Sequence, residues 1–461
     1  MGFGRVFYIV GLIVIVLLTV PAASAYIDPG TGGYLLSSLW GWFVGLATLA
    51  FVVVGHFFRH TLKNWWTRLH RKHKVLIIAI PLVVVICIAG YFVYENNANN
   101  AKFTLPDFDP KLVNVTKNTD KAFDGYTFID GKLMDMNGAV VHQWKYGYLG
   151  VIDKNGDLYG QREYESPIWG RYSWNGSVIW EMKLPIHHEI VLTPNNTVIV
   201  LTKEVHEYYG RNVEFDVIAE FDKNGTFIRK WSTWDHLAEL HQYHANLELD
   251  KPMVSLAQDK KDNLWKNTSV WGGNYDYYHM NAVSLVPVTS MEGKHPAFNP
   301  GNYLISFRHG SMVFIISKDT GKVLWRAVYS EVKDNLEGPH SPHMLPDGNI
   351  LLYDNGRYRG WTRLLLLNPV TLGVVWQYRN DAFFSYSQGF VQQLPNNNML
   401  VTESDKGHVF ELDPAGEVVW EWWNPAKFID PGNDNFGKRH DIYRAIRYDK
   451  AFIDGFLKNG N

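Results

Sequence analysis

AGEVVWEW, at residues 415–422, is the clearest copy of a short unit that recurs along this chain. Each copy has a glycine turn, a run of β-branched residues and usually an aromatic residue; the others are NGAVVHQW (137–144), NGSVIWEM (175–182), NGTFIRKW (224–231), TGKVLWRA (320–327) and LGVVWQYR (372–379). Glycine supplies the positive φ of a tight hairpin, and alternating valine and tryptophan suit a half-buried strand. The unit therefore predicts a β-hairpin at each of its six positions.

A second pattern precedes several of these hairpins and completes the repeat. It is seen in LTPNNTVIVL (192–201), NPGNYLISF (299–307), LPDGNILLY (345–353) and LPNNNMLVT (394–402). The hairpin glycines are mostly 38 to 52 residues apart, and one gap of 96 holds an insertion at about 232–276. Four strands in about 40–50 residues are typical of a β-propeller blade, so we predict an all-β, six-bladed propeller. A pair of β-sandwiches is the alternative, but it would not need this self-similarity.

The composition does not indicate a nucleic-acid-binding protein, and it excludes an internal disulfide. The 461 residues carry a formal net charge of −2, so the charge does not indicate a nucleic-acid partner. The single cysteine, Cys87, lies in an apolar run and cannot form a disulfide within the chain. We expect most of the 18 tryptophans to pack between blades.

The first hundred residues differ in composition from the rest. Residues 1–25 have a basic start, an apolar stretch and a small-residue site, which predicts a signal peptide or a first membrane helix. Residues 26–95 predict a membrane helical hairpin, with apolar runs at 35–58 and 75–94 around the basic segment RHTLKNWWTRLHRKHK. The positive-inside rule places that segment in the cytoplasm. We therefore expect a protein of the cytoplasmic membrane, with a propeller at 103–448 on the extracytoplasmic side and a C-terminal tail at 449–461.

Several histidines occupy matching positions at the entry of a blade's first strand. Counting five residues back from Leu345 and Leu192 gives His340 and His187, and YYHMNAVSLVP places His279 in a similar position. The first strand of each propeller blade lines the central channel. We therefore expect these three imidazoles to meet at one mouth of the channel.

Arginines follow the same strands. SFRHGS contains Arg308 and His309, and DNGRYRGWTR contains Arg357 and Arg359. Guanidinium groups bind oxyanions through forked, charge-assisted hydrogen bonds, and a neutral imidazole can attack an electrophile or move a proton. The grouping predicts an anion-binding pocket, although a single histidine at a strand entry is more often structural, and Arg308 could simply brace two blades.

Other histidines are weaker candidates. His340 and His343 in HSPH have a metal-like spacing, but Pro342 opposes the helix that would aim both rings at one ion, so we predict no metal site and no cofactor. For His187, His188 and His343, structural and functional roles are equally open. His241 and His244 lie in the insertion, where we expect a lid or a surface role.

The segment from about 103 to 448 resembles the arylsulfate sulfotransferases that do not use a nucleotide sulfate donor. The matching pieces are HHEIVLTPNNTVIVL, YYHMNAVSL, LISFRHGSMVFIISKDTGKVLW, PHSPHMLPDGNILLYDNG and GFVQQLPNNNMLVTESDKGHVFELDPAGEVVWEW. The resemblance implies an extracytoplasmic six-bladed propeller with a pocket of His and Arg on its axis. It also implies transfer of a sulfuryl group from an aryl sulfate to a phenol, through a sulfated histidine.

The resemblance also implies roles for particular residues. His279 matches the histidine of a His-x-Asn piece, which includes Asn281, and His340 matches the histidine before a leucine–turn–strand piece. Arg359, or Arg357, matches an arginine after Asp-Asn-Gly. We therefore predict that His340, His279 and Arg359 are catalytic, and that the substrate is bound by His187, Asn281, Arg308, His309 and Arg357.

One piece departs from the family pattern. The family's sulfated histidine lies late in the propeller, but the corresponding segment here, FFSYSQGFVQQL (383–394), contains no histidine. Later candidates are His408, in KGHVF, and His440, in KRHDIYRAIRY. Either His340 or His279 takes the role of the nucleophile, or this protein has changed chemistry.

Two functions of other classes remain open. A propeller can bind an anionic or aromatic ligand without turning it over, and ligand binding without turnover would identify it. A quinoprotein-like propeller is suggested by DTGKVLWRA, but such propellers generally have eight blades and an acidic calcium site, and the absorbance of the purified protein would reveal the cofactor.

Overall fold

The structure is a computed structural model. It describes Arg68, Leu105 and residues 107–164, 166–243, 254–255, 270–430 and 435–459. The chain divides into two compact units, Met1–Ala101 and Lys102–Asn461. Apart from Arg68, the predicted signal peptide or first helix (1–25) and membrane hairpin (26–95) lie outside the described residues, so these remain predictions. Among the described residues, no helix is both long and apolar enough to cross a membrane.

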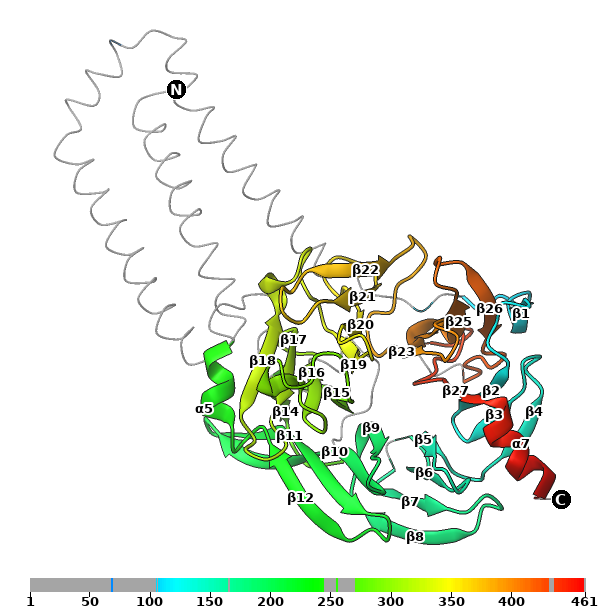
Figure 1. The fold of residues 1–461 in the computed structure, drawn as a ribbon, viewed down its shortest axis with the longest axis horizontal. Coiled ribbons are helices and arrows are strands. Elements are labelled where there is room, and N and C mark those ends of the chain that lie inside the picture. Colours follow the sequence, from blue (N-terminus) through cyan, green and yellow to red (C-terminus); the bar gives the residue numbers. More distant parts are fainter. Residues whose placement is uncertain are drawn as a thin grey trace. The chain divides into compact units, whose positions relative to one another are not determined.

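Within the described part of the second unit, six sheets stand around a common axis, and this confirms the predicted six-bladed propeller (Figure 1). Blade I consists of β27 (Ile446–Asp449), β2 (Gly125–Ile129), β3 (Lys132–Met134) and β4 (Val140–Gln143). Blade II consists of β5 (Tyr148–Ile152), β6 (Leu158–Gln161), β7 (Ile168–Tyr172) and β8 (Val178–Lys183). Blade III consists of β9 (His187–Leu192), β10 (Thr197–Tyr208), β11 (Arg211–Asp222) and β12 (Phe227–Ser232).

The remaining blades follow the same order from the axis outward. Blade IV consists of β15 (Met280–Leu285), β16 (Tyr303–Phe307), β17 (Met312–Ile316) and β18 (Val323–Val328). Blade V consists of β19 (His340–Met344), β20 (Ile350–Asp354), β21 (Arg363–Leu367) and β22 (Val374–Tyr378). Blade VI consists of β23 (Phe390–Gln393), β24 (Met399–Glu403), β25 (His408–Leu412) and β26 (Val418–Trp423).

Both ends of the propeller segment take part in closing the ring. β1 (Asn114–Asn118) pairs with β26 as a fifth, outer strand of blade VI. β27 comes from the end of the chain and pairs with β2 as the inner strand of blade I. The ring is therefore closed by an outer and an inner strand pair, and each pair joins segments more than three hundred positions apart. The hydrogen bond from Thr116 to Glu421, across a separation of 305, is one example.

The repeated glycines are found at the turn into the fourth strand of each blade. Gly138, Gly176, Gly225, Gly321 and Gly416 have φ between 71° and 84°, the left-handed conformation that favours glycine. In blade V, Leu372 takes this conformation instead, with φ 55°, and Gly373 follows it. The predicted hairpins are therefore confirmed at all six positions. In blade V the residue with positive φ is the one before the glycine.

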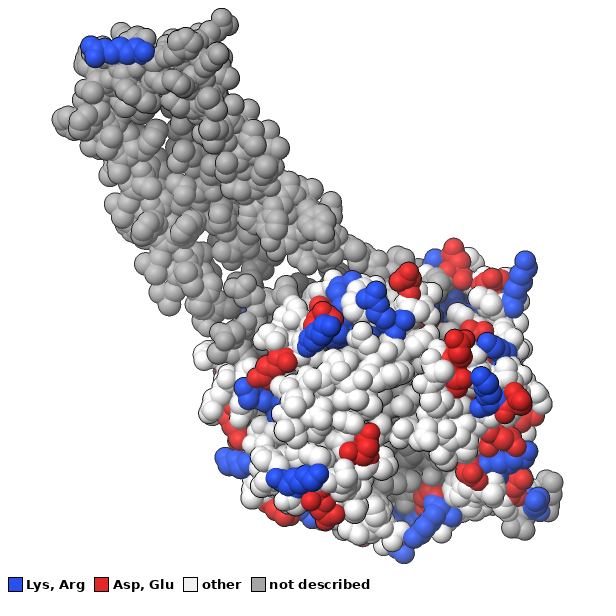
Figure 2. All heavy atoms as spheres, turned by 45° about the horizontal axis from the view of Figure 1, so that its top comes forward, with Lys and Arg blue, Asp and Glu red and all other residues white. Residues whose placement is uncertain are grey.

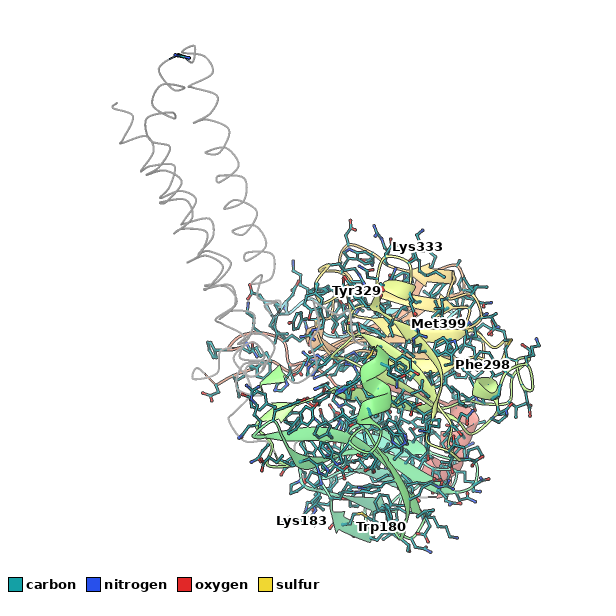
Figure 3. All side chains as sticks on the ribbon, turned by 90° about the vertical axis from the view of Figure 1, so that its left-hand side faces the viewer. Trp180, Lys183, Phe298, Tyr329, Lys333 and Met399 are labelled. Atoms are coloured by element: carbon teal, nitrogen blue, oxygen red, sulfur yellow. The ribbon has the colours of Figure 1, made fainter. Side chains whose placement is uncertain are left out.

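The tryptophans of the repeat join neighbouring blades. Their indole N–H groups donate to carbonyl oxygens in the outer turn of the next blade, over 2.6 to 3.1 Å, in the pairs Trp144–Ser173, Trp180–Lys223, Trp231–Gly321, Trp325–Pro369 and Trp420–Met136. Figure 3 labels Trp180 at the outer edge of blade II. A buried indole needs a partner for its N–H. The repeated unit thus encodes a blade and also its contact with the next blade.

The insertion in blade III adds short elements to its outer side. These are α5 (Leu237–Leu240), β13 (Val254–Ser255) and β14 (Tyr275–Asp276), and β14 runs parallel to β11. Single-turn 3-10 helices also occur, at His241–Tyr243, Pro296–Phe298, Tyr329–Glu331 and Ser404–Lys406. The parallel pairing matters for function because it holds the end of β14, where Asp276 contacts the ring of His279.

The segment predicted as a C-terminal tail is mostly helical. Helix α7 (Lys450–Asn459) packs on blades I and II, where Ile453 is fully buried beside Leu158 and Tyr172. On the face of the propeller seen in Figure 2, basic and acidic side chains are interspersed, in keeping with the small net charge.

Candidate active site

The inner strands of blades II, III and V share a backbone device where they meet the axis. Their second residues, Leu149, His188 and Ser341, have φ between 53° and 57°, and the strand register shifts at this point. Non-glycine residues rarely adopt positive φ, and a bulge of this kind re-aims the neighbouring side chains. His187 and His340 occupy the same position immediately before the bulge, as the sequence spacing predicted.

These strand entries bring imidazoles from three blades together. The ring centroid of His188 lies 5.0 Å from His187, 5.0 Å from His279 and 6.4 Å from His340. His309, on the turn after β16, lies 5.2 Å from His279. We call these five residues the histidine cluster.

His340 is held in a single tautomer. Its Nδ1 lies 3.0 Å from the carbonyl oxygen of Gly338 and 2.7 Å from Oδ1 of Asn355. The amide of Asn355 cannot turn, because its Nδ2 donates to the carbonyls of Ser385 and Gln388. Both partners of Nδ1 are acceptors, so Nδ1 carries the proton and Nε2 keeps its lone pair. Burial lowers the pKa of His340 to about 3, so the ring is neutral at neutral pH.

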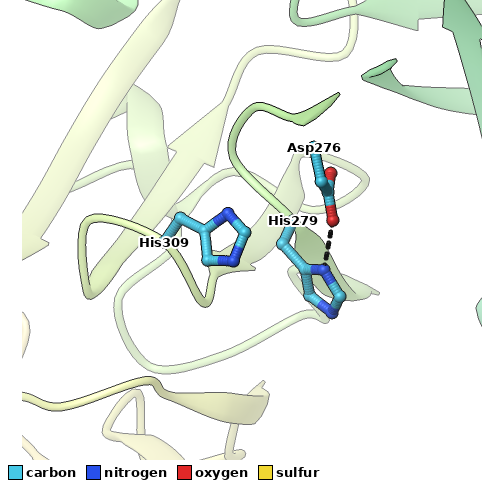
Figure 4. Close-up of side chains that lie close together, drawn as sticks. All are labelled: Asp276, His279 and His309. Atoms are coloured by element: carbon cyan, nitrogen blue, oxygen red, sulfur yellow. Dashed lines mark hydrogen bonds and ion pairs between the residues drawn. The ribbon is translucent and has the colours of Figure 1, made fainter. Parts of the chain in front are cut away.

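His279 is oriented by a carboxylate (Figure 4). Its Nδ1 lies 2.5 Å from Oδ2 of Asp276, which leaves Nε2 as the basic atom. Burial lowers the pKa of His279, while the charge of Asp276 opposes this shift and the charges of Arg308 and Lys203 add to it. An imidazole backed by a carboxylate is suited to accepting a proton, because the carboxylate stabilises the imidazolium that forms.

The tautomer of His188 follows from its neighbours. Nε2 of His187 lies 3.3 Å from the carbonyl oxygen of Thr202, which can only accept, so this nitrogen carries a proton. Nδ1 of His187 therefore accepts from Nδ1–H of His188, 2.7 Å away. That leaves Nε2 of His188 as a third lone pair within the histidine cluster, beside those of His340 and His279.

The predicted arginines differ in what they contact. Arg308 is 3% exposed, and its positive charge lowers the pKa of both His279 and His340, so its guanidinium lies beside the cluster. Arg357 packs against Gly338, the residue that binds Nδ1 of His340, and donates to the hydroxyl of Tyr386 over 3.2 Å. Arg308 therefore brings a positive charge to the histidine cluster, and Arg357 brings one beside Gly338.

Arg359 and Asn281 are held in the framework. Arg359 donates to the carbonyls of Trp361 and Asp354 at 3.0 and 2.9 Å, contacts that brace the turn after β20. Asn281 donates to the carbonyl of Pro339 and accepts from Ser306, so it supports the backbone beside His340. The geometry therefore favours Arg357 over Arg359 as the arginine near His340.

Some residues at the site carried no signal in the sequence. Tyr443, in the segment before β27, lies 5.8 Å from the ring of His188. Its neighbour Arg444 is buried, forms an ion pair with Glu189 and donates to the carbonyl of Leu149. Asn355 and Asp276 were also missed, although the spacing of Asp276 three residues before His279 is a usable signal in retrospect.

The described residues include one grouping with metal-like geometry. Ligand atoms of Asp276, His279 and His309 all lie within 4.8 Å of one another. However, the ammonium of Lys203 bonds to Asp276 and the charge of Arg308 acts on His279, so the grouping already contains cations. This charge balance suits an anion better than a divalent cation. His343 lies apart from this group in β19, with Nδ1 2.8 Å from the carbonyl oxygen of Ser341.

Neither late histidine has the geometry of a nucleophile. His408 lies between two carboxylates, with Nδ1 2.8 Å from Glu403 and Nε2 3.0 Å from Glu421, so both nitrogens donate. His440 is half-exposed and stacks on Phe428 with ring centroids 3.9 Å apart. Among the described residues, the histidine cluster is therefore the remaining candidate for that role.

The doubly paired His408 predicts a pH-dependent contribution to stability. Burial lowers its pKa, but the two glutamates outweigh burial and raise it. Because the folded-state pKa is raised, the contribution is complete below the unfolded value of about 6.5 and is lost as pH rises through the folded value. We expect His408→Gln to lower the urea midpoint at about pH 6, and the difference from wild type to narrow toward about pH 9. His440→Gln is the control, and a difference that stays constant or widens with pH would contradict this prediction.

The family model for arylsulfotransferase (ASST) matches residues 130–425 of the chain, which spans the histidine cluster and most of the propeller. The chain belongs to the arylsulfotransferase family. This match confirms the family that the sequence resembled. A comparison with curated proteins finds no match.

Solved structures similar to this arylsulfotransferase family member are distant. A protein of unknown function from Bacteroides caccae is 13% identical, with a TM-score of 0.42, and the match covers 70% of this chain and 98% of that one. A streptogramin B lyase is 12% identical (TM-score 0.37, coverage 75% and 96%). A virginiamycin B lyase from Staphylococcus aureus is 9% identical (TM-score 0.31, coverage 61% and 70%). These likenesses are too weak to bear on function.

Proposed function

We propose that this protein transfers a sulfuryl group from an aryl sulfate to a phenol through His340. The observation that carries the proposal is the state of this residue. His340 is buried and neutral, and its Nδ1–H is fixed by two acceptors. Its Nε2 keeps a lone pair, and Arg308 lies beside the histidine cluster. A fixed, neutral imidazole can attack the sulfur of a sulfate ester, and an adjacent guanidinium can stabilise the negative charge on the sulfate oxygens.

In the first half-reaction, Nε2 of His340 attacks the sulfur of the aryl sulfate. The N–S bond forms, the S–O bond to the aryl group breaks, and its electron pair leaves on the phenolate. Arg308 and Arg357 stabilise the charge on the sulfuryl oxygens. The positive charge that develops on the ring of His340 is shared, through Nδ1–H, with the oxygens of Asn355 and Gly338.

In the second half-reaction, the oxygen of the acceptor phenol attacks the same sulfur. The N–S bond breaks, its electron pair returns to Nε2 of His340, and the phenolic proton passes to Nε2 of His279. Solvent then carries this proton to the phenolate that was released first. Two displacements through one carrier produce ping-pong kinetics.

The partners of Nδ1 divide the roles between the two histidines. Asp276 is an anion and stabilises a full positive charge on His279, as a base requires. Asn355 is neutral and stabilises positive charge on His340 less than Asp276 does on His279, so the imidazole of His340 stays unprotonated and keeps its lone pair available for the sulfur. We therefore assign the nucleophile to His340 and the base to His279.

The test is turnover of 4-nitrophenyl sulfate by the full chain, with and without phenol. We expect release of nitrophenol that depends on phenol, formation of phenyl sulfate in equal amount, and parallel lines in double-reciprocal plots. Release without formation of phenyl sulfate would identify a hydrolase instead. Folded protein that releases nothing with a series of phenols would contradict the proposal.

A second candidate function is recognition of an anionic or aromatic ligand without turnover. The specific observation in its favour is the segment 383–394, which lacks the family's late histidine. The same cluster and arginines would then bind the ligand. Saturable binding of 4-nitrophenyl sulfate, with no product over hours, would support this function against the first.

A further inference from the structure

A buried acidic group lies behind His279. It consists of Glu214 and Asp216 on β11 and Asp276 at the end of β14, and each is at most 2% exposed. One cation enters this group from β10. The ammonium of Lys203, whose side chain is 5% exposed, lies 2.7 Å from Oδ1 of Asp276 and 3.3 Å from Oε2 of Glu214. Burying charges at this density requires that they be paired.

Asp276 links the acidic group to the histidine cluster. Its Oδ1 pairs with the ammonium of Lys203, and its Oδ2 accepts the hydrogen bond from Nδ1 of His279. One carboxylate therefore connects the two side chains. Lys203 therefore fixes the carboxylate that fixes His279. It also withdraws part of the negative charge that Asp276 would otherwise present to the imidazole.

We propose that Lys203 is a positioning residue for sulfuryl transfer, which holds Asp276 in place and keeps His279 in its neutral, proton-accepting form. This inference rests on the proposed function of His279 as the base. Lys203 reaches none of the reacting atoms in this assignment and acts only through Asp276.

The charges around His279 explain why such a residue is needed. Its neighbours are Asp276 and Lys203 from blade III, Arg308 and His309 from blade IV, His340 from blade V, and His188 and His187 from β9. Asp276 alone favours the imidazolium form, and Glu214 behind it adds negative charge. Lys203 offsets these carboxylates, and Arg308 opposes the imidazolium from the other side.

The same balance is visible from the carboxylates. Burial raises the pKa of Asp276, but Lys203 and His279 outweigh it and lower the pKa well below its ordinary value. Burial raises the pKa of Asp216 to about 8, so this carboxyl takes up the first excess proton of the group. Without Lys203, the remaining negative charge would draw a proton onto His279, and a protonated His279 cannot accept one from a phenol.

Lys203→Met tests the inference because it keeps length and burial but removes the charge. We expect the acid limb of kcat/KM against pH to move upward by about one unit, with a smaller change in KM for the donor. Lys203→Arg should move the limb back toward its wild-type position. Lys318→Met is the matched control. Lys318 forms an ion pair with Glu220, at the other end of β11, over 3.0 Å, so its substitution should leave the pH profile unchanged.

A second readout does not depend on turnover. We expect NMR titration of the His279 imidazole, assigned with His279→Gln, to show a higher pKa in Lys203→Met than in wild type. If the variant does not fold, Lys203→Gln replaces it. A His279 that titrates at the same pH in both proteins would overturn the role of Lys203. A shifted His279 in a protein that transfers no sulfuryl group would instead overturn the proposed function and leave the Lys203–Asp276–His279 contact established.

Discussion

Replacing His340 with alanine is expected to lower kcat/KM for sulfuryl transfer by about 10³-fold or more, because removing a covalent nucleophile removes the pathway itself. The neighbouring lone pairs of His188 and His279 do not replace it. In this assignment His279 is committed to the acceptor's proton, and the ring of His188 lies 6.4 Å from that of His340, so its lone pair starts from a different position. The variant should still fold, because the substitution removes one side chain at the start of β19 and leaves the backbone pairing of that strand with β20 in place.

Three measurements separate this result from a general loss of activity. Steady-state rates with 4-nitrophenyl sulfate give the fold-change, and His440→Ala, at a half-exposed histidine, should be unaffected. Mass spectrometry after mixing wild-type enzyme with donor alone should locate the sulfuryl group on the peptide that contains His340. A His340→Ala enzyme with near wild-type turnover, or a label on the peptide of His279, would move the nucleophile to that residue.

Removing the charge of Arg447 should have the largest effect on stability. This residue of β27 donates through Nε to Thr127 at 2.8 Å and through Nη1 to the carbonyl of Phe123 at 2.6 Å. Nη1 also lies 3.3 Å from Oε2 of Glu411, on β25 of blade VI, and both side chains are fully buried. The pair thus joins blades I and VI where the ring closes.

Arg447→Leu leaves the charge of Glu411 buried without its partner, which costs about 3–5 kcal/mol in the free energy of unfolding. Urea denaturation measures the loss. The double variant Arg447→Leu/Glu411→Leu should recover much of it, because an apolar pair of similar volume replaces two charges at little cost. Lys450→Leu, which removes an exposed ion pair with Asp124 near the same terminus, should change stability little. A single variant within about 1 kcal/mol of wild type would show that the closure does not depend on this pair.

The blades could be predicted because their information is local. A glycine turn and an alternating strand lie within eight residues, and the tryptophan in the same unit provides the contact to the next blade. The convergence of His187, His279 and His340 followed from the repeat, because equivalent positions in successive blades meet at the axis. Arg308 and His309 followed from their place directly after β16.

The roles of the arginines could not be read in this way. Arg357 and Arg359 are two residues apart in one turn, and nothing in their spacing separates them. Packing against Gly338 places Arg357 near His340, whereas carbonyls and the carboxylate of Asp354 occupy Arg359. Only the path of the turn in space decides which of the two side chains packs beside Gly338.

By itself, the sequence determined the propeller, its six blades and the meeting of histidines from different blades, because a repeat of short range repeats its geometry. The tertiary structure decided which nitrogen of each imidazole carries a proton, since that depends on partners such as Asn355 for His340 and Asp276 for His279. It also decided how the ring closes on the site, through pairs such as Arg444 and Glu189, which are 255 positions apart. Contacts at such separation arise from the closure of the whole ring, and no local pattern encodes them.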